Sequence, residues 1–412
     1  MMTVAVRRLS ELWPEASIGV ITDAPGRLAV AAPGAVPIPA AGRRLWFSEP
    51  YFGSRLHSRL PDAAARALRR REERLRRRWP RVAGSTIRMR RRLTGKDSGE
   101  LHQFLDWASS AELVVASGAG LLTDSYASLA CTTLELLEMA LDRGAGAAML
   151  GQGVGPLTDS GLEAVGRAVL PRLGLIGLRE GRFGKPILDR LGVSEDRMVT
   201  TGDDAIELAF PGTDHKPSGA GLGVGIRVAR YSGISEVELE AIGAALSDAA
   251  DRHGAELIPV PVSSHVRERD AEVIARVLGR PASEIAPLPS PERLIARIAD
   301  CRVVITGSYH GAVFALAQGI PALGLVGSGY YAGKFGGLAD QFEGGCAVVN
   351  TMESQLARRL GSAIDSAWQT APQQAQPLLS SAERQRDLGR EAYARLRGVV
   401  AGAAEPRPAG VR

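Results

Sequence analysis

One short segment, residues 306–311 (TGSYHG), combines residue types that could bind an anion and move a proton. It lies between two apolar runs, which predicts the end of a strand followed by the start of a helix. The free N–H groups of a first helical turn favour an anion, and Ser308 could cap that helix. Tyr309 and His310 fall in the same turn, where an imidazole can bind an anion or transfer a proton. The alternative is a packed strand–helix junction with a hydrogen-bonded histidine.

Three cations elsewhere could hold the same anion. Arg227 and Arg230 come at the end of residues 223–228, which read as a strand. Arginine recognises phosphate or carboxylate through two parallel hydrogen bonds. Lys334 follows a long stretch without formal charge, and a lone lysine in such a region is a candidate anion contact. For the arginines, surface charge in an arginine-rich chain is the alternative.

Polar residues follow three further apolar runs. In the glycine-rich turn at residues 151–156 (GQGVGP), Gln152 is the side chain with useful hydrogen-bonding groups. The pairs at residues 179–180 (RE) and 203–204 (DD) end the next two runs. We expect the acidic residues of both pairs to cap helices.

Composition excludes several classes of protein. Of 412 residues, 45% are hydrophobic and 23% are charged, which argues against a disordered or fibrous chain. The three cysteines are widely spaced and build no disulfide framework, which favours a reducing compartment and hence the cytoplasm. No His or Cys pair has metal-ligand spacing, so we expect neither a metal nor a separate cofactor. No segment reads as a signal peptide or a transmembrane span.

Strands alternate with helices from residue 112 onward, which predicts an α/β fold with parallel sheets. The predicted strands are residues 112–117, 147–151, 175–179, 198–201, 223–228, 256–260, 303–306, 322–326 and 346–349. The predicted helices are residues 125–143, 161–173, 183–191, 235–253, 265–278, 291–300, 309–318, 352–370 and 381–398. A linker rich in Pro and Gly at residues 211–221 separates the halves, so we expect two Rossmann-like, doubly wound domains facing a cleft.

The predicted domains are residues 1–210 and 211–350. C-terminal helices at residues 351–400 and a disordered tail at residues 401–412 follow. Ligands of open parallel sheets bind beyond the carboxyl ends of the strands. The candidate residues above all follow predicted strands, so we expect the site in the cleft between the domains.

The first hundred residues are less regular. We expect a helix at residues 3–13, a strand at 17–22, a loop at 31–43 and a basic helix at 61–79. Thirteen arginines lie between residues 66 and 92, against two glutamates. Such a segment could bind nucleic acid or an anionic membrane. Because arginine lies on every face and no DNA-reading motif is present, we expect a solvated helix and no nucleic-acid partner, and leave peripheral membrane contact open.

The order of the motifs resembles that of the polysaccharide pyruvyl transferase family over about residues 5–350. The motifs are GQGVGP at 151–156, LRE at 178–180, TGDD at 201–204, GIR at 225–227, SYHGAVFA at 308–315, GIP at 319–321 and YAGK at 331–334. The resemblance implies two Rossmann domains of the glycosyltransferase GT-B type. It also implies transfer of a pyruvyl group from phosphoenolpyruvate to a sugar hydroxyl, as a ketal. The partners would be phosphoenolpyruvate and a glycan or lipid-linked glycan acceptor.

The resemblance also implies roles for the candidate residues. His310 would be the acid/base or a phosphate ligand, and the cations Arg227, Arg230 and Lys334 would contact the donor. Ser308, Tyr309 and Gln152 would line the substrate site, on a donor side in the C-terminal domain and an acceptor side in the N-terminal domain. Many family members carry arginine where this chain has Ser308. Arg179 would buttress the first domain.

Two other functions stay open at this point. One is a GT-B glycosyltransferase that uses a nucleotide sugar, and the other is a non-catalytic member that binds an anion or acts as a scaffold. Family members usually open with an apolar strand and a Gly-Asn-rich loop. This sequence goes directly into a predicted helix, so we expect the N-terminal sheet to lack its first strand, with impaired activity, unless the true start lies upstream.

Overall fold

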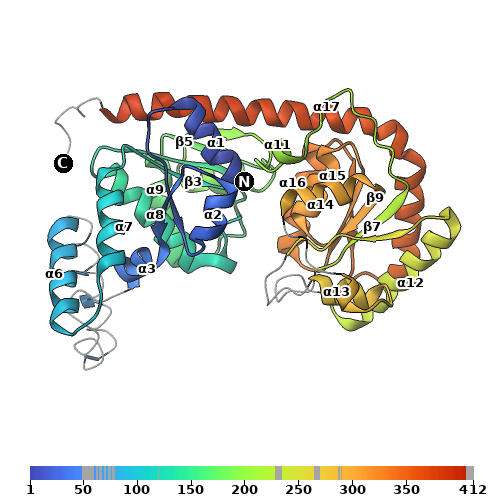
Figure 1. Ribbon diagram of the computed structural model, residues 1–412, viewed down its shortest axis with the longest axis horizontal. Coiled ribbons are helices and arrows are strands. Elements are labelled where there is room, and N and C mark those ends of the chain that lie inside the picture. The colour runs from blue at the N-terminus through green and yellow to red at the C-terminus, as the bar shows by residue number, and fades with distance from the viewer. Residues whose placement is uncertain are drawn as a thin grey trace.

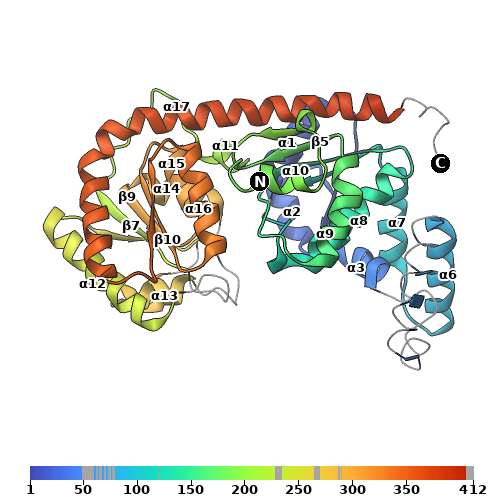
Figure 2. The same ribbon diagram turned by 180° about the vertical axis from the view of Figure 1, so that it is seen from behind.

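The chain folds into two α/β units joined by a long C-terminal helix (Figures 1 and 2). The computed structural model describes residues 1–48, 60–61, 64, 67–68, 71–72, 76, 79–118, 120–227, 234–263, 270–285, 288 and 290–404. Each unit is built on a parallel sheet with helices on its faces, which confirms the predicted fold class.

The N-terminal unit contains a four-stranded parallel sheet in the order β3-β4-β5-β6. In chain order its elements are β3 (Leu113–Ser117), α8 (Ala127–Leu141), β4 (Gly146–Gln152), α9 (Ser160–Val169), β5 (Leu175–Leu178), α10 (Gly184–Arg190), β6 (Met198–Thr200) and α11 (Ile206–Ala209). All seven residues of β4 are buried, because helices cover both faces of the sheet. The predicted alternation of strands and helices in this unit is confirmed.

The segment before this sheet departs from the predicted pattern. It contains α1 (Met2–Leu12), β1 (Gly19–Thr22), α2 (Pro25–Ala31), β2 (Val36–Pro39), α3 (Ala40–Ser48), α6 (Pro80–Leu93) and α7 (Gly99–Ser110). The predicted loop at residues 31–43 is wrong, since β2 pairs in parallel with β1 and α3 follows at once. Two prolines in β2 hide the strand in the sequence, although an edge strand tolerates them.

The strands β1 and β2 form a sheet of their own, separate from the four-stranded sheet. Most of the predicted basic helix at residues 61–79 lies outside the described residues. The absence of a first strand stays a prediction. Within the described ranges, no helix is long and apolar enough to cross a membrane.

The C-terminal unit has a five-stranded parallel sheet in the order β11-β10-β9-β7-β8. Its elements are β7 (Gly221–Gly225), α12 (Glu236–His253), β8 (Leu257–Pro259), α13 (Asp270–Val277), α14 (Pro291–Ala299), β9 (Cys301–Thr306), α15 (Tyr309–Ala317), β10 (Ala322–Val326), α16 (Gly329–Gln341) and β11 (Cys346–Asn350). Strand order reverses between the neighbours β7 and β9. In doubly wound sheets this switch point is where ligands bind, so the loops after β7 and β9 are placed for binding.

Helix α16 was not predicted, because its four glycines are poor helix formers. Tertiary packing stabilises it: Tyr331, Phe335 and Leu338 are at most 3% exposed. A Cβ at Gly337 would lie 2.7 Å from the side chain of Glu180. The glycine therefore lets α16 approach the N-terminal unit closely.

The C-terminal helices predicted as two are one helix, α17 (Leu356–Ala404), of 49 residues. It bends as it passes from the C-terminal unit to the N-terminal unit (Figure 1). Pro372 and Pro377 lie inside it, and proline bends a helix without ending it where packing compensates. The predicted disordered tail begins too early, since residues 401–404 are helical; residues 405–412 lie outside the described part.

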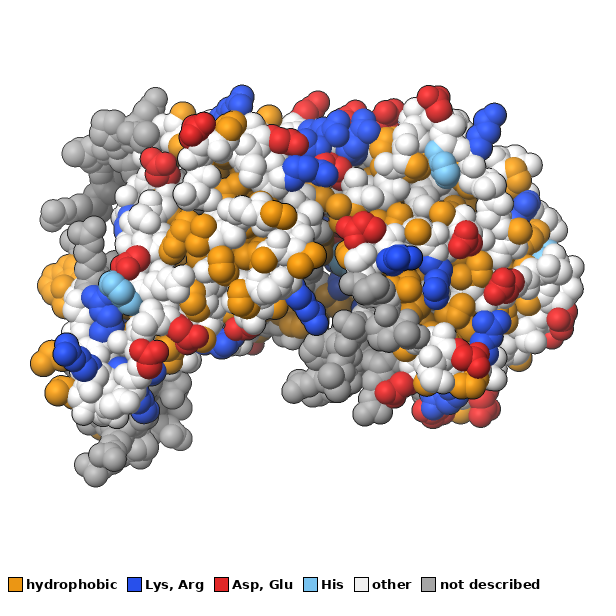
Figure 3. Space-filling model, in the orientation of Figure 1, with side chains coloured by type: hydrophobic (Ala, Val, Ile, Leu, Met, Phe, Trp, Pro, Cys, Tyr) orange, Lys and Arg blue, Asp and Glu red, His pale blue; other side chains and the backbone are white. Residues whose placement is uncertain are grey.

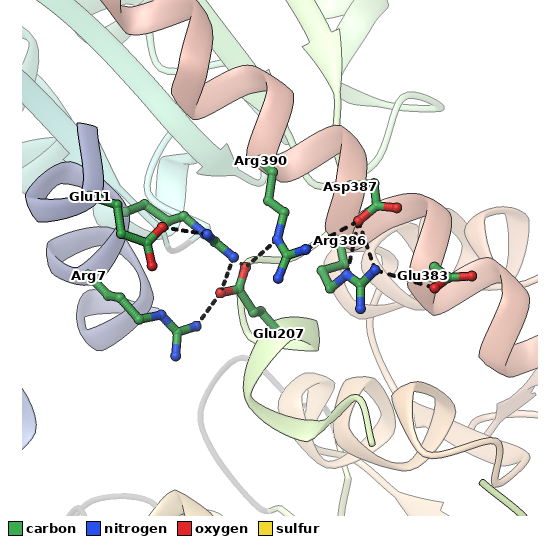
Figure 4. A network of polar contacts seen from close by, with 8 residues as sticks. Arg7, Glu11, Glu207, Glu383, Arg386, Asp387 and Arg390 are labelled. Carbon is green, nitrogen blue, oxygen red and sulfur yellow. Dashed lines mark hydrogen bonds and ion pairs between the residues drawn. The ribbon is translucent and has the colours of Figure 1, made fainter. Parts of the chain in front are cut away.

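A charged network ties both ends of the chain to the N-terminal unit (Figure 4). Glu207 on α11 accepts hydrogen bonds from Arg7 and Arg8 of α1. Its Oε2 atom also lies 4.0 Å from Nε of Arg390 on α17. The Glu207 side chain is only 10% exposed, so these contacts are poorly screened by water.

We expect Glu207→Gln to lower the free energy of unfolding by about 2 kcal/mol, because several charge-assisted hydrogen bonds lose their anion. Chemical denaturation of the full chain measures the change. The control is Glu383→Gln, which removes a 41% exposed partner of Arg386 and should change stability by less than about 0.5 kcal/mol. Equal effects of the two variants would contradict a stabilising role for the Glu207 contacts.

Candidate active site

The backbone at the ends of β7 and β9 builds the start of α15. The amide of Gly307 donates to the carbonyl of Gly225 at 2.9 Å, and the Thr306 hydroxyl donates to the same carbonyl at 2.8 Å. Thr306 Oγ1 also accepts the Ser308 amide at 2.9 Å. The predicted helix cap by Ser308 is therefore wrong: Ser308 occupies the N-cap position, but its side chain makes no capping hydrogen bond.

Arg179 lies at the centre of the contact between the two units. It follows β5, is 3% exposed, and its Cζ lies 4.1 Å from the centroid of the Tyr309 ring on α15. Its Nη1 is 3.8 Å from Oδ2 of Asp203, which lies in the loop between β6 and α11. A Cβ at Gly153 would lie only 2.5 Å from Nη2 of Arg179. The glycine-rich turn therefore makes room for the guanidinium.

His310 faces Asp203 across the same junction. Its Nε2 is 3.7 Å from Asp203 Oδ2, and its side chain is 30% exposed. Burial lowers the pKa of His310, and the positive charges of Arg179 and Arg227 lower it further, against the opposing effect of Asp203. The imidazole is therefore neutral at neutral pH and can accept a proton.

Helix α16 brings Tyr330 and Lys334 to the same place. A Cβ at Gly120 would lie 3.0 Å from Arg179 Nη2, 3.2 Å from the Tyr330 hydroxyl and 3.3 Å from Lys334 Cε. Lys334 Nζ lies 4.0 Å from the centroid of the Tyr330 ring. Two cations and a phenol thus converge above the backbone that follows β3.

Several buried polar atoms at this junction have no hydrogen-bond partner in the described chain. They are Arg179 Nε, Asp203 Oδ2, Ser308 Oγ, Tyr309 OH, His310 Nε2 and Tyr330 OH. A buried polar atom without a partner costs free energy, and native proteins contain few of them. Their grouping where two units meet is typical of a site that a polar ligand completes.

The structure thus brings four predicted site residues together: Ser308, Tyr309, His310 and Lys334. Arg179 and Asp203 join them. The sequence signal for these two was their position directly after a strand, but it indicated a buttress and a helix cap. Asp203 holds the start of α11 and also belongs to the candidate site, because its Oδ1 accepts the Ala205 amide at 2.8 Å while its Oδ2 faces Arg179 and His310.

Two other predicted residues are committed to contacts within the fold, and Arg230 lies outside the described residues. Arg227 donates from Nε and Nη2 to the carboxylate of Asp270, at 3.1 and 2.9 Å. Gln152 is fully buried, and its Nε2 donates to three backbone carbonyls at 3.0 Å at the ends of β3 and β4. Arg227 is thus paired with Asp270, and its charge lowers the pKa of His310. Gln152 holds the ends of β3 and β4 together through its hydrogen bonds.

Within the described ranges, no three His, Cys, Asp or Glu side chains are grouped as a metal ion would require.

Next to Asp203, Asp204 is nearly buried and accepts a hydrogen bond from the Tyr393 hydroxyl of α17 at 2.9 Å. Burial, followed by the charge of Asp203, raises the pKa of Asp204 to about 6.

This raised pKa predicts a pH-dependent stability. Because the folded protein holds the Asp204 proton more tightly than the unfolded chain, its contribution is full below pH 3.8 and is lost as the pH rises to about 6. We expect wild type to lose up to about 3 kcal/mol relative to Asp204→Asn across this range. Unfolding free energies measured from pH 4 to 7 test it, with the exposed substitution Asp387→Asn as the control. Parallel curves for wild type and Asp204→Asn would contradict the raised pKa.

Comparisons with known proteins identify the family of this chain. A family model described as polysaccharide pyruvyl transferase matches residues 1–329. No curated protein matches the chain.

Solved structures share the fold at low identity. A glycosyltransferase of kitacinnamycin has a TM-score of 0.53 and 12% identity, covering 97% of this chain and 95% of that chain. A UDP-GlcNAc 2-epimerase from Neisseria meningitidis, bound to UDP-GlcNAc, has a TM-score of 0.53 and 10% identity, covering 97% and 95%. S. aureus MnaA with UDP has a TM-score of 0.53 and 13% identity, covering 93% and 90%. The fold is thus that of GT-B proteins, and because the family model covers most of the chain, the protein belongs to the polysaccharide pyruvyl transferase family.

Proposed function

We propose that this protein transfers the pyruvyl group of phosphoenolpyruvate to hydroxyls of a glycan or lipid-linked glycan precursor, without a separate cofactor. The observation that carries the proposal is the group of buried polar atoms without partners around Arg179 and His310. Most of these atoms are hydrogen-bond donors or belong to a neutral imidazole. Such a set suits a small ligand with several negative oxygens.

Phosphoenolpyruvate carries a phosphate and a carboxylate on adjacent atoms, so its recognition needs several donors close together. Arg179 Nε and the hydroxyls of Tyr309 and Tyr330 supply donors, and Lys334 supplies a second positive charge. The first turn of α15 adds free N–H groups and the positive end of its dipole. The donor would therefore lie between the start of α15 and the loops after β3 and β5.

The reaction needs two proton transfers, and His310 is placed for the first. Its neutral imidazole takes the proton of the first acceptor hydroxyl as that oxygen bonds to C2 of the donor, and returns it to the methylene carbon C3. The C2–O bond to phosphate then breaks, the second hydroxyl bonds to C2, and its proton leaves with phosphate. Asp203 stabilises the imidazolium while it exists, and Arg179 stabilises the charge on the departing phosphate.

Ligand-induced stabilisation of the full chain tests the donor. We expect phosphoenolpyruvate to raise the melting temperature in a concentration-dependent way and UDP-sugars to leave it unchanged. Arg179→Met should abolish the shift, whereas Arg182→Gln, at a 54% exposed position nearby, should keep it.

The outcomes separate the three functions. A shift with phosphoenolpyruvate, together with release of inorganic phosphate in the presence of a glycan acceptor, supports pyruvyl transfer. A shift with a UDP-sugar instead would overturn the proposal in favour of glycosyl transfer, which the GT-B fold also accommodates. Binding of phosphoenolpyruvate without turnover on any acceptor would favour a non-catalytic anion-binding member.

A further inference from the structure

Helix α6 lies at the end of the N-terminal unit, far from the candidate site (Figure 1). It exposes an unusual amount of apolar surface. Met89 is 66% exposed, Leu93 is 76% exposed and Val82 is 53% exposed, and Trp79 at the N-cap is 58% exposed. These are four of the twelve strongly exposed large hydrophobic side chains in the described part of the chain. Grouped exposure of this kind marks an interaction surface, whereas single exposed hydrophobic residues are common.

The exposed residues share one side of the helix. Val82, Met89 and Leu93 are spaced by seven and four residues, which places them on one face. The opposite face carries Ala83 and Ile87, which are at most 1% exposed and belong to a hydrophobic cluster with α7 and α3. The fold therefore uses the inner face, and nothing in the N-terminal core requires the outer one to be apolar.

Positive charge flanks this outer face. Helix α6 contains no acidic residue and ends with Arg90, Arg91 and Arg92, and Lys96 follows; Arg92 and Lys96 are exposed. Basic and hydrophobic side chains lie next to each other over α6 at the left edge of Figure 3. The sequence from residue 66 to residue 92 holds thirteen arginines and two glutamates, so the segment leading into α6 is strongly basic as well.

Exposed apolar side chains together with flanking positive charge favour one kind of partner. Nucleic acid would use the arginines, but it gives no reason for exposed methionine, leucine and valine on the same face. A second copy of the chain would bring one arginine-rich face against another, and like charges repel. An anionic bilayer surface uses both features, because apolar side chains enter the boundary between headgroups and acyl chains while arginine and lysine contact lipid phosphates. Tryptophan at the edge of such a face favours the same boundary.

We propose that α6 docks the protein on a bilayer surface that contains anionic phospholipid. The outer face, defined as Trp79, Val82, Met89 and Leu93, enters the interface, and Arg92 and Lys96 contact lipid phosphates. The proposal does not depend on the identity of the donor, because α6 lies outside the candidate active site.

Vesicle binding by the full chain tests the docking. We expect it to sediment with phosphatidylcholine vesicles that contain about 30 mol% phosphatidylglycerol, at least about tenfold more tightly than with phosphatidylcholine alone. The triple variant Val82→Ser/Met89→Ser/Leu93→Ser should lose at least about tenfold in affinity for the anionic vesicles. The matched control, Val30→Ser/Val237→Ser/Met352→Ser, removes equally exposed apolar side chains elsewhere and should bind as wild type does. Circular dichroism and thermal melting establish that both variants fold.

A second pair of variants tests the charge. Arg92→Gln/Lys96→Gln should weaken anionic-vesicle binding by about tenfold or more, and Arg27→Gln/Arg293→Gln, exposed on α2 and α14, should not. Equal binding to neutral and anionic vesicles, or equal losses in test and control variants, would overturn the proposal. Binding to single- or double-stranded RNA without vesicle binding would also overturn it. So would a concentration-dependent dimer that the serine triple variant abolishes in the absence of lipid.

Discussion

The His310→Gln variant is expected to lose about 100- to 10,000-fold in the rate of phosphate release from phosphoenolpyruvate and acceptor, while it folds normally. Glutamine keeps polarity and approximate size but cannot take up and return a proton. The imidazole Nε2 has no hydrogen-bond partner in the described chain and the side chain is 30% exposed, so little folding energy depends on it. Because the proposed role of His310 is proton transfer, the loss should fall on kcat, and the KM for phosphoenolpyruvate should change less.

His102→Gln is the matched control, because His102 lies on the exposed surface of α7. It should retain wild-type turnover. A His310→Gln variant with a kcat within about threefold of wild type would show that His310 is not the acid/base, and would reassign it to ligand contact.

The pH profile gives a second readout of the same assignment. Because the pKa of His310 is lowered, the base form persists below the usual range of histidine, and the acidic limb of kcat/KM should lie below pH 6.5. Asp203 raises this pKa, so Asp203→Asn should move the acidic limb to still lower pH. An unchanged limb in Asp203→Asn would contradict the coupling between the two side chains.

The Gly153→Ala variant is expected to raise the KM for phosphoenolpyruvate at least about tenfold, by adding a single methyl group. Its Cβ would lie 2.5, 2.6 and 2.7 Å from Nη2, Nε and Cζ of Arg179. The guanidinium is nearly buried between the Tyr309 ring and Asp203, so it can move only by leaving the position proposed for donor binding. Loss of one charge-assisted hydrogen bond corresponds to about tenfold or more in affinity.

Steady-state kinetics and the thermal shift with phosphoenolpyruvate both report the change. The control is Gly329→Ala at the start of α16, where an added Cβ meets no atom within 4 Å. Its KM should equal that of wild type. If Gly153→Ala binds phosphoenolpyruvate as wild type does, Arg179 is a structural residue and the donor lies elsewhere.

Local patterns were sufficient for most of the fold. Strands such as β10, predicted at residues 322–326 and found there, are short apolar runs bounded by helices and turns, and both faces of the sheet are covered. The pattern failed where local preference and tertiary context disagree. Prolines obscure β2 in the sequence and glycines obscure α16. Two helices were predicted at residues 352–370 and 381–398, whereas α17 continues through Pro372 and Pro377. In each case packing outweighs a local penalty of a few kcal/mol at most.

For the candidate site, the sequence by itself determined which residues follow strands, and so it predicted Ser308, Tyr309 and His310 as site residues. It predicted Lys334 from the long uncharged stretch before it. It could not determine which of several strand-end residues meet. Arg179 and Asp203 belong to the N-terminal unit and His310 to the C-terminal one, more than a hundred residues away, so their contact exists only when both units pack together. Packing within each unit pairs Arg227 with Asp270 and turns the Gln152 amide toward the backbone. Residue types and spacing are local properties, whereas the partner of a buried charge is a property of the assembled fold. This is why only the tertiary structure decided which cations and hydrogen-bond donors lie together at the candidate site.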